Sequence, residues 1–417
     1  MDLKRVVVTG IGAITPIGKT VQDFWNGLQR GESGCDFVHQ FDISKFKTRF
    51  ACEVKDFDPT NYLDRKEARK LDRYAQFALI ASDEAVKDAG ITADNVDHDR
   101  VGVIFASGIG GLITFQEEVT NFALGDGTPR FNPFFIPKMI LDIAAGHISM
   151  RYGFRGPNFA VVSACASSTN AIIDAFDNIR IGKADIIVTG GSEAVISAAG
   201  VGGFNAMKAL SERNDDPKTA SRPFDKERDG FVMGEGAGVL ILESLEHALA
   251  RGAKIYCEVA GGGATADAHH ITAPHPEGLG AKNVMAAALK DAAMKPEDID
   301  YINVHGTSTP LGDVAEVKAI MNIFGAHAYN LNISSTKSMT GHCLGAAGAL
   351  EALSCILAVT KNIIPPTINH FVDDPELDPK LNFTFNKAQH KTVNAALSNT
   401  FGFGGHNASV ILKKYSA

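Results

Sequence analysis

Short apolar runs alternate with longer amphipathic stretches along the whole chain. The runs hold four to six residues and are nearly continuous in hydrophobicity, which is typical of strands that helices cover on both faces. Their alternation with helical patterns predicts an α/β architecture. The predicted strands are Arg5–Thr9, Val101–Ala106, Phe159–Ser163, Asp185–Thr189, Gly238–Leu242, Ile255–Ala260, Tyr301–His305, Leu331–Ser334, Ala395–Ser398 and Ala408–Leu412.

The clearest helical pattern predicts one helix over Arg65–Ala89. Leu71, Leu79 and Val86 recur at spacings that place them on one face of a helix. Gly90 follows directly and is a natural C-terminal cap.

Two similar segments divide the chain. Arg5–Pro16 and Ile255–Thr265 both read as a strand followed by a loop of Gly, Ala and Thr, and each precedes further strands and helices. We therefore expect a duplicated α/β unit with halves at residues 1–254 and 255–417. The long polar gap Asn205–Phe231 predicts an ordered surface excursion or lid.

Composition narrows the class of protein. The 417 residues exceed the roughly 250–300 at which a single core stops growing, which also favours two units. A hydrophobic share of 45% excludes intrinsic disorder, and a net charge of −8 argues against a nucleic-acid binder. The start MDLKRVVVTG lacks the apolar core of a signal peptide, and the longest uncharged stretch holds polar groups that hydrocarbon disfavours. We expect a soluble, cytoplasmic protein with no membrane partner.

Six cysteines are present, and one of them has an unusual setting. No CxxC or CxxH spacing occurs, so a zinc or redox motif is not expected, and a chain this long needs no disulfide framework. Cys165 lies in a turn of small residues between a predicted strand and a helix that begins near Ala166. The helix N-terminus would lower the pKa of its thiol and favour a reactive thiolate. A buried structural cysteine is the alternative, and we expect the other five only to pack.

Three further polar turns follow predicted strands. His305 precedes the turn GTST, where it either acts as a donor or base or caps the loop. Lys337 and His342 follow another strand, and Glu351 lies on the helix after them, where a carboxylate needs a partner. The third turn, NTFGFGG, has glycines at 402, 404 and 405 that could aim backbone N–H groups at an anion. Phosphate-loop and dinucleotide fingerprints are absent. Because equivalent strand ends of an α/β sheet meet at one crevice, these groups should converge there with Cys165.

These segments resemble the β-ketoacyl-acyl-carrier-protein synthases, and the elongating, type II branch most of all. The resemblance spans essentially the whole chain. It rests on the segment around Cys165 and on VVVTGIGAITPIG, SRPFDKERDGFVMGEGAG, VHGTSTPLGD, SSTKSMTGHCLGAAGA and NTFGFGGHN. It implies the thiolase fold, in which duplicated halves form a five-layered α-β-α-β-α sandwich, and it implies a homodimer.

The resemblance also assigns roles. Cys165 matches the nucleophile, His305 and His342 match the two catalytic histidines, and the Cys–His–His set separates this branch from initiating synthases and thiolases. Lys337 and Glu351 match the supporting charged pair. The remaining matches are Phe403 as the gating residue whose N–H joins that of Cys165 in an oxyanion hole, Thr307 and Thr309 for the pantetheine arm, and Ile109 and Phe401 for the substrate. His406 departs from the threonine often found in relatives and leaves the mobility of the gating loop open.

The implied reaction is a decarboxylative Claisen condensation that needs no redox cofactor. Its partner would be acyl carrier protein, acyl- or malonyl-loaded, docked on the basic residues Lys66, Arg69, Lys70 and Lys208; a solvated helix face is the alternative for these side chains. The resemblance allows a structural monovalent cation, but the sequence identifies no ligand set, and no metal site is expected. A thiolase-like enzyme with Cys343 as second cysteine and a non-catalytic chain-length partner are less favoured, the latter because Cys165 is present. Chain length and the choice between fatty-acid and polyketide pathways stay open.

Overall fold

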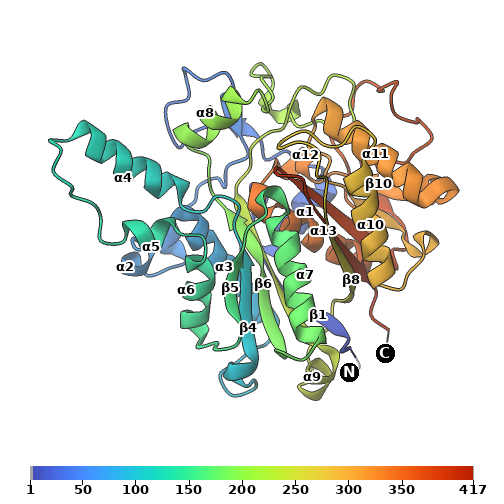
Figure 1. Cartoon of the computed structure of the whole chain (residues 1–417), viewed down its shortest axis with the longest axis horizontal. Helices are drawn as coiled ribbons and strands as arrows, with labels where there is room; N and C mark the ends of the chain where they lie inside the picture. The colour runs from blue at the N-terminus through green and yellow to red at the C-terminus, as the bar shows by residue number, and fades with distance from the viewer. Residues whose placement is uncertain (1–2, 417) are drawn as a thin grey trace.

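The computed structural model describes residues 3–416, and a ten-stranded mixed sheet runs through its centre (Figure 1). Two groups of five strands meet edge to edge where β1 pairs with β8. The first group, from its outer edge inwards, is β5 (Asn158–Val161), β4 (Val101–Ala106), β6 (Ile186–Glu193), β7 (Gly236–Ser244) and β1 (Val6–Ile14). The second group, in the same direction, is β10 (Asn332–Ser334), β9 (Tyr301–Asn303), β13 (Ala395–Gly402), β14 (His406–Lys413) and β8 (Cys257–Ala266). All ten predicted strands are present, with ends that differ by a few residues.

The two groups have the same topology, strand for strand. In each, the three outer strands pair in parallel and the two inner strands pair antiparallel. We call the first group, with its helices, the N unit and the second the C unit. This repeat is what the duplicated fold predicts, whereas the division of the chain at residue 254 stays a prediction.

Helices complete five layers. α7 (Ser167–Arg180) and α13 (Ala347–Lys361) pack against each other, and each contacts strands of both units, so they form the middle layer. α3 (Arg73–Asp88) and α6 (Ile143–Tyr152) cover the outer face of the N unit. α10 (Leu279–Asp291) and α11 (Pro310–Phe324) lie on the C unit. The α-β-α-β-α sandwich is therefore confirmed.

Glycines at the start of each unit let the outer helices approach their strands. A Cβ placed on Gly12 of β1 would lie 1.9 Å from the carbonyl oxygen of Ala81 in α3. A Cβ placed on Gly263 of β8 would lie 2.5 Å from the carbonyl oxygen of Val284 in α10. The two glycine-containing segments that look alike in the sequence thus have the same packing role.

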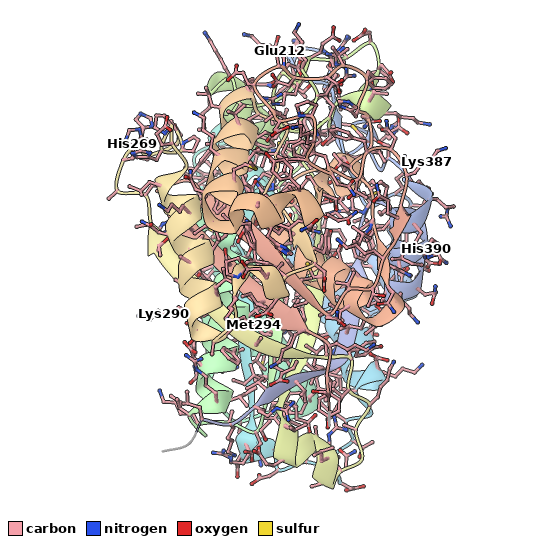
Figure 2. The ribbon with its side chains drawn as sticks, turned by 90° about the vertical axis from the view of Figure 1, so that its right-hand side faces the viewer. Glu212, His269, Lys290, Met294, Lys387 and His390 are labelled. Atoms are coloured by element: carbon pink, nitrogen blue, oxygen red, sulfur yellow. The ribbon has the colours of Figure 1, made fainter. Side chains whose placement is uncertain are left out.

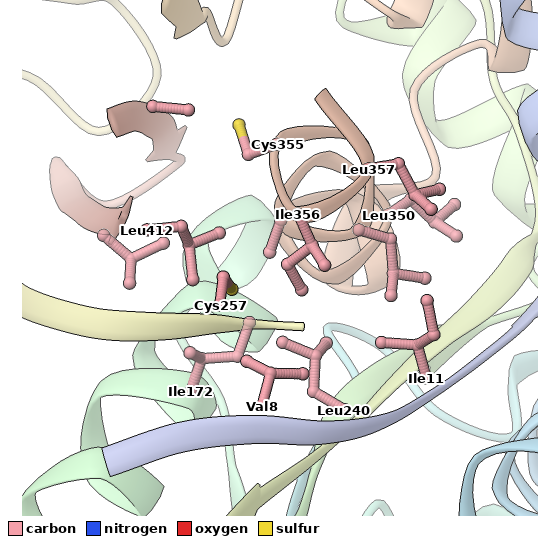
Figure 3. Close-up of a cluster of buried hydrophobic side chains, with 14 of the residues drawn as sticks. Val8, Ile11, Ile172, Leu240, Cys257, Leu350, Cys355, Ile356, Leu357 and Leu412 are labelled. Carbon is pink, nitrogen blue, oxygen red and sulfur yellow. The ribbon is translucent and has the colours of Figure 1, made fainter. Parts of the chain in front are cut away.

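α13 is the core helix of the middle layer (Figure 3). Leu350, Ile356 and Leu357 pack with side chains of β1, β7, β8 and β14. The stretch Leu344–Lys361 is long and apolar enough to cross a membrane, with a mean hydropathy of 1.4, but 89% of it is buried inside the protein. Cys257 and Cys355 pack in the same cluster, and all six cysteines are free and buried.

The prediction of one helix over Arg65–Ala89 is wrong. The segment forms α2 (Arg65–Ala68) and then α3, which begins only at Arg73. The buried Asp72 ends the first and caps the second, because its carboxylate accepts the N–H of Tyr74 and both the N–H and hydroxyl of Thr114. An aspartate that bonds backbone N–H groups in this way favours a cap over a helix interior.

Two excursions leave the sandwich. α4 (Leu112–Leu124) and α5 (Phe135–Met139) project from the N unit, as Figure 1 shows. The polar gap at 205–231 follows α8 (Ala198–Ala206) and packs on the C unit, where it buries Arg222, Asp225 and Arg228. It is thus more than the surface excursion that its polarity predicts. The remaining elements are α1 (Val21–Arg30), α9 (Leu245–Ala250), α12 (Lys337–Thr340), the strand pairs β2–β3 (Asp36–Phe37, Phe50–Ala51) and β11–β12 (Ile363–Ile364, Gln389–His390), and short 3-10 turns.

Candidate active site

Cys165 lies on a sharp elbow between β5 and α7. The backbone enters the left-handed region at Ala164 (φ 51°), makes a 3-10 turn over Ala164–Ala166, and continues as α7 from Ser167. A left-handed non-glycine residue costs about 1–2 kcal/mol, so surrounding contacts must hold it. Ser167 supplies two of them, since its hydroxyl donates to the Ala164 carbonyl and accepts the N–H of Ser163. The elbow thereby presents Cys165 at the first turn of a helix.

One cavity of about 620 Å³ collects most of the predicted site. It lies where the strand ends of both units meet, as the topology predicts. The predicted residues on its wall are Cys165, His305, His342, Phe401, Phe403, Thr307, Thr309, Ile109 and Lys208. Lys337 and Glu351 are buried behind this wall, and Lys66, Arg69 and Lys70 lie apart from it on the outer surface.

The two histidine rings face each other at a right angle. Their centroids are 5.2 Å apart with an interplanar angle of 87°, and Phe231 and Phe401 each stand against one ring. Nδ1 of each ring is buried without a hydrogen-bond partner among residues 3–416, which leaves Nε2 to meet a bound molecule. Burial, reinforced by the charge of Lys337, holds the pKa of both imidazoles well below the usual value of 6.5. Both rings are therefore neutral near pH 7 and act as N–H donors rather than as cations.

A buried ion pair lies directly behind the histidines. The Lys337 ammonium contacts the Glu351 carboxylate, and both side chains are about 2–3% exposed. Burial raises the pKa of Glu351, and the Lys337 charge opposes that rise. Because the same ammonium disfavours a second positive charge nearby, it adds to the effect of burial in keeping the imidazoles neutral.

The thiol of Cys165 is not the ready thiolate that its helix position predicts. Burial raises its pKa to about 12, against the lowering effects of the Lys337 charge and of the Phe403 backbone N–H. The local sequence pattern reveals the helix terminus but not the parts of the protein that enclose the thiol. Their desolvation raises the pKa of the thiol by more than the helix terminus lowers it. The thiol must therefore lose its proton as it reacts, not before.

The predicted glycine loop reaches this sulfur. A Cβ on Gly402 would lie 2.6 Å from the Ser163 carbonyl oxygen and 3.1 Å from the Cys165 nitrogen, so only glycine allows the approach. Gly404 and Gly405 take φ values of 89° and 76°, which turn the chain back into β14. Because its neighbours are glycines, the backbone can approach the elbow closely and place Phe403 over it.

Two buried carboxylates at the site have no counterpart in the sequence prediction. Glu193, at the end of β6, accepts N–H groups from Gly108, Ile109, Gly110 and, from the C unit, Gly345. Glu316 of α11 accepts the N–H groups of His305 and Gly306, each at 2.9 Å, and burial raises its pKa to about 7. A glutamate that ends an otherwise apolar strand needs a partner, and that signal could have identified Glu193.

Three unpartnered buried oxygens suit the cation that the resemblance allows. Asn303 Oδ1, Glu351 Oε2 and Ser398 Oγ are buried without partners in the described chain, and Asn303 and Ser398 are register partners in β9 and β13. Neutral and anionic oxygens of this kind are the donors that hard cations take. No group of three or more His, Cys, Asp or Glu among residues 3–416 is placed to hold a metal ion.

The fold and the cavity together define a condensing enzyme of the thiolase-like class. The chain belongs to the β-ketoacyl synthase family, since the models of its N-terminal and C-terminal domains match residues 3–248 and 256–371. It is 51% identical over 415 residues to a 3-oxoacyl-[acyl-carrier-protein] synthase 2 of Synechocystis sp., covering 100% of this chain and 99% of the relative. It is 49% identical to a protein of the same name from Staphylococcus aureus, covering 99% of each.

Solved ketosynthases have the same fold. A β-ketoacyl synthase from Burkholderia phymatum superposes with a TM-score of 0.91 at 36% identity, covering 99% of this chain and 100% of that one. A type II PKS ketosynthase, solved in complex with its acyl-carrier protein and bound to the hexaketide, superposes with a TM-score of 0.91 at 34% identity and the same coverage.

Proposed function

We propose that this chain condenses malonyl-acyl-carrier-protein with an acyl chain held on Cys165, losing carbon dioxide and giving a 3-oxoacyl-acyl-carrier-protein two carbons longer. The observation that carries the proposal is the convergence of one elbow thiol and two neutral imidazoles on a single cavity. Relatives named 3-oxoacyl-[acyl-carrier-protein] synthase 2, at 49–51% identity over the full chain, favour fatty-acid elongation. A polyketide pathway is the alternative, which the 34% identity to the polyketide ketosynthase supports less.

In the first half-reaction the Cys165 sulfur attacks the thioester carbonyl of an acyl carrier. The new S–C bond forms as the bond to the carrier sulfur breaks, and the thiol proton leaves with the carrier thiol. Backbone N–H groups of Cys165 and Phe403 stabilise the oxyanion, each by roughly 3 kcal/mol. Such transient stabilisation matters here because burial disfavours a free thiolate.

In the second half-reaction a malonyl thioester takes the place of the first carrier. Its carboxylate leaves as carbon dioxide, and the electron pair of the broken C–C bond moves into an enolate whose oxygen faces the histidines. Neutral His305 and His342 donate from Nε2 to that oxygen. The carbanion then attacks the acyl-Cys165 carbonyl, the bond from that carbonyl carbon to the Cys165 sulfur breaks, and the leaving sulfur takes a proton from water.

The other predicted residues have supporting roles in this proposal. Thr307 and Thr309, whose hydroxyls are 3.1 Å apart at the cavity wall, hold the pantetheine arm. Ile109 and Phe401 line the path of the acyl chain. Lys337, which Glu351 holds in place, adds to burial in keeping the imidazoles neutral and does not touch substrate. A monovalent cation would bind at Asn303, Ser398 and Glu351.

Docking of the acidic carrier would use the basic surface on α2 and its following turn. Lys66, Arg69 and Lys70 are exposed there, and Lys70 lies 5.4 Å from the Phe134 ring of the α4–α5 excursion. Arg151 pairs with Glu67, the acidic residue within α2, at 2.7 Å, which leaves the surface positive. Lys208 stands on the cavity wall, where it would meet the carrier beside the entrance.

A second copy of this chain would cover the bare edge of the N unit. β5 is the outermost strand there, and Phe159 and Val162 are 40% and 54% exposed. The opposite edge is different, because the Asn382 carbonyl accepts the Ile333 N–H of β10. An exposed apolar strand edge favours pairing with a strand of another chain, and antiparallel pairing of two β5 strands would form the homodimer. Val162→Asp should give monomers in sedimentation, whereas Leu311→Asp, at an exposed apolar site elsewhere, should not.

The decisive experiment supplies acyl- and radiolabelled malonyl-carrier proteins and measures product length. A product two carbons longer supports the proposal, and label that stays unextended contradicts it.

Carrier docking is tested by charge reversal. Changing Lys66, Arg69 and Lys70 to Glu should raise the KM for the carrier protein at low salt, and the same reversal of Lys282, Lys290 and Lys387 should not. Figure 2 shows Lys290 and Lys387 on the other side of the molecule. A cytoplasmic location is part of the proposal and suits a soluble carrier.

A further inference from the structure

The loop that carries Thr307 and Thr309 is held in a strained backbone. Ser308, between the two threonines, has a φ of 69°, which is unfavourable for a residue with a side chain. The two threonine hydroxyls are 3.1 Å apart and both face the cavity. The strain implies that groups outside the loop fix its shape.

Those groups come from the polar segment at 222–230. The Arg222 N–H donates to the Ser308 hydroxyl, and the Gly230 N–H donates to the Ser308 carbonyl, each at 3.1 Å. Arg228 reaches the next two carbonyls, with Nε at 3.2 Å from Thr309 O and Nη2 at 3.0 Å from Pro310 O. One planar guanidinium therefore sets the spacing of two consecutive peptide groups.

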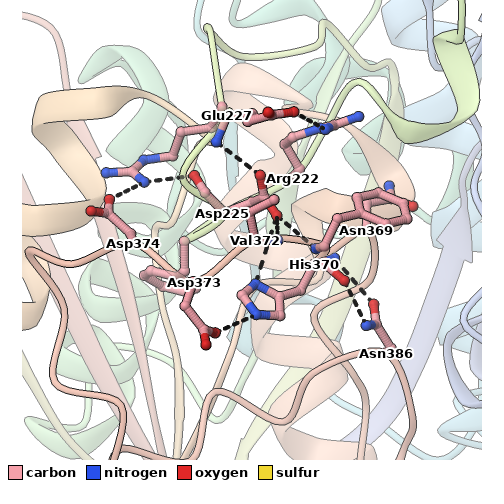
Figure 4. Close-up of polar contacts among 12 residues, drawn as sticks. Arg222, Asp225, Glu227, Asn369, His370, Val372, Asp373, Asp374 and Asn386 are labelled. Carbon is pink, nitrogen blue, oxygen red and sulfur yellow. Dashed lines mark hydrogen bonds and ion pairs between the residues drawn. The ribbon is translucent and has the colours of Figure 1, made fainter.

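Arg228 is itself fixed on its other sides. Its side chain is 3% exposed, and Nη1 bonds the Asp225 carbonyl at 2.7 Å and the Asp374 carboxylate at 2.5 Å. Figure 4 shows how Asp225 in turn accepts the N–H groups of the neighbouring C-terminal segment, including that of Val372 at 2.8 Å. Nε also lies 3.4 Å from the carboxylate of Asp313, at the start of α11. Every nitrogen of the guanidinium thus has a partner, and Arg228 does not line the cavity.

We infer that Arg228 is a positioning residue for the carrier-borne arm of the substrate. This inference rests on the proposed function. By holding the carbonyls of Thr309 and Pro310, Arg228 keeps the hydroxyls of Thr307 and Thr309 directed at a pantetheine amide. Arg228 touches neither the reacting carbon nor the sulfur. Its loss should therefore weaken binding of pantetheine thioesters and leave the intrinsic reactivity of Cys165 intact.

The test compares Arg228→Lys and Arg228→Gln with Arg222→Lys. Arg222 is a matched control, because it is a buried arginine of the same segment whose side chain bonds Thr219 and faces Glu227, while only its backbone N–H, which the substitution keeps, bonds Ser308. Both Arg228 variants should raise the KM for acyl-pantetheine and malonyl-carrier about 10–100-fold, with kcat changed less. Arg228→Lys should not restore the wild-type KM, because lysine lacks the planar, forked guanidinium that bonds both carbonyls. Arg222→Lys should keep the wild-type KM.

Two further readouts separate positioning from general damage. The rates of Cys165 alkylation by iodoacetamide and of Cys165 acylation by a simple alkyl thioester, which lacks the pantetheine amides, should stay within about twofold of wild type. Asp374→Asn, which weakens an anchor of Arg228 and keeps an oxygen for the N–H of Glu376, should shift KM in the same direction by less and serves if Arg228→Gln does not fold. An unchanged KM in the Arg228 variants, or equal losses with both thioester types, overturns the inference. Absence of condensation in the wild type would instead defeat the proposed function.

Discussion

The two elbows that lead into the middle layer have the same backbone conformation but present different groups. Each begins with a left-handed non-glycine residue, Ala164 at φ 51° and Leu344 at φ 46°, makes a 3-10 turn and enters a buried helix. The position that holds Cys165 in the N unit holds Gly345 in the C unit. Gly345 offers only its N–H, which donates to Glu193 of the N unit at 3.0 Å.

The chain between strand and elbow also differs. In the N unit two residues separate the end of β5 from the turn, whereas in the C unit residues 335–343 intervene and form α12. That insertion carries Lys337 and His342. The two units thus use the same elbow geometry for different groups: the N-unit elbow presents Cys165, and the segment before the C-unit elbow carries Lys337 and His342.

The largest expected effect is at the N-unit elbow. Cys165→Ala should lower the condensation rate by roughly 10⁴-fold or more, because no other group can carry the acyl chain. Cys343→Ala is the matched control, since Cys343 is a buried thiol beside the other elbow. Steady-state rates of the two variants distinguish the roles, and loss of activity in Cys343→Ala would favour the two-cysteine, thiolase-like alternative.

The insertion before the C-unit elbow is tested by Lys337→Met. The free energy of unfolding should fall by about 3–5 kcal/mol, because Glu351 would remain buried without its partner. The pKa of His305 and His342 should rise, since Lys337 lowers both, so the acid limb of the pH–rate profile should move to higher pH. The double variant Lys337→Met/Glu351→Leu should recover the free energy of unfolding but not the wild-type pH–rate profile. An acid limb that stays in place would contradict the role of the ammonium.

The C-unit elbow itself is tested by Gly345→Ala. A Cβ there would lie 2.1 Å from the Gly108 nitrogen and 2.7 Å from a Glu193 oxygen, so we expect a loss of about 3 kcal/mol in denaturant unfolding. Gly146→Ala in α6 meets nothing within 4 Å and should instead stabilise by up to about 1 kcal/mol. Equal stability of the two variants would mean that the elbows do not pack as described.

The smallest effect is the dependence of stability on pH. At His305 and His342, whose pKa values are lowered in the fold, the unfolded chain binds more protons below pH 6.5 than the native one, whereas at Glu316, whose pKa burial raises to about 7, the native chain binds more. The contribution of each ring to the free energy of unfolding should therefore be fully retained above pH 6.5 and decrease below it, by up to about 1.4 kcal/mol per pH unit, and protonation of Glu316 should offset part of this decrease. Urea titrations at pH 7 and pH 5 should show a smaller decrease for His305→Asn, and an identical decrease would contradict buried neutral rings.

Local patterns predicted most of the fold, because most strands contain a nearly continuous apolar run of the kind that a buried sheet favours. They failed at Asp72, where a buried carboxylate caps a second helix, since capping of this kind depends on Thr114 far along the chain. The pKa of Cys165 was mispredicted for a related reason. A helix terminus can be read from the sequence, whereas the walls that desolvate the thiol come from both units.

The central claim is that Cys165 carries the acyl chain, and intact-protein mass with peptide mapping tests it most directly. After incubation with acyl-carrier protein alone, the account predicts one added acyl group per chain, located on the peptide that contains Cys165 and released by hydroxylamine. An acyl group on any other residue, or condensation that proceeds with Cys165 never acylated, would contradict it.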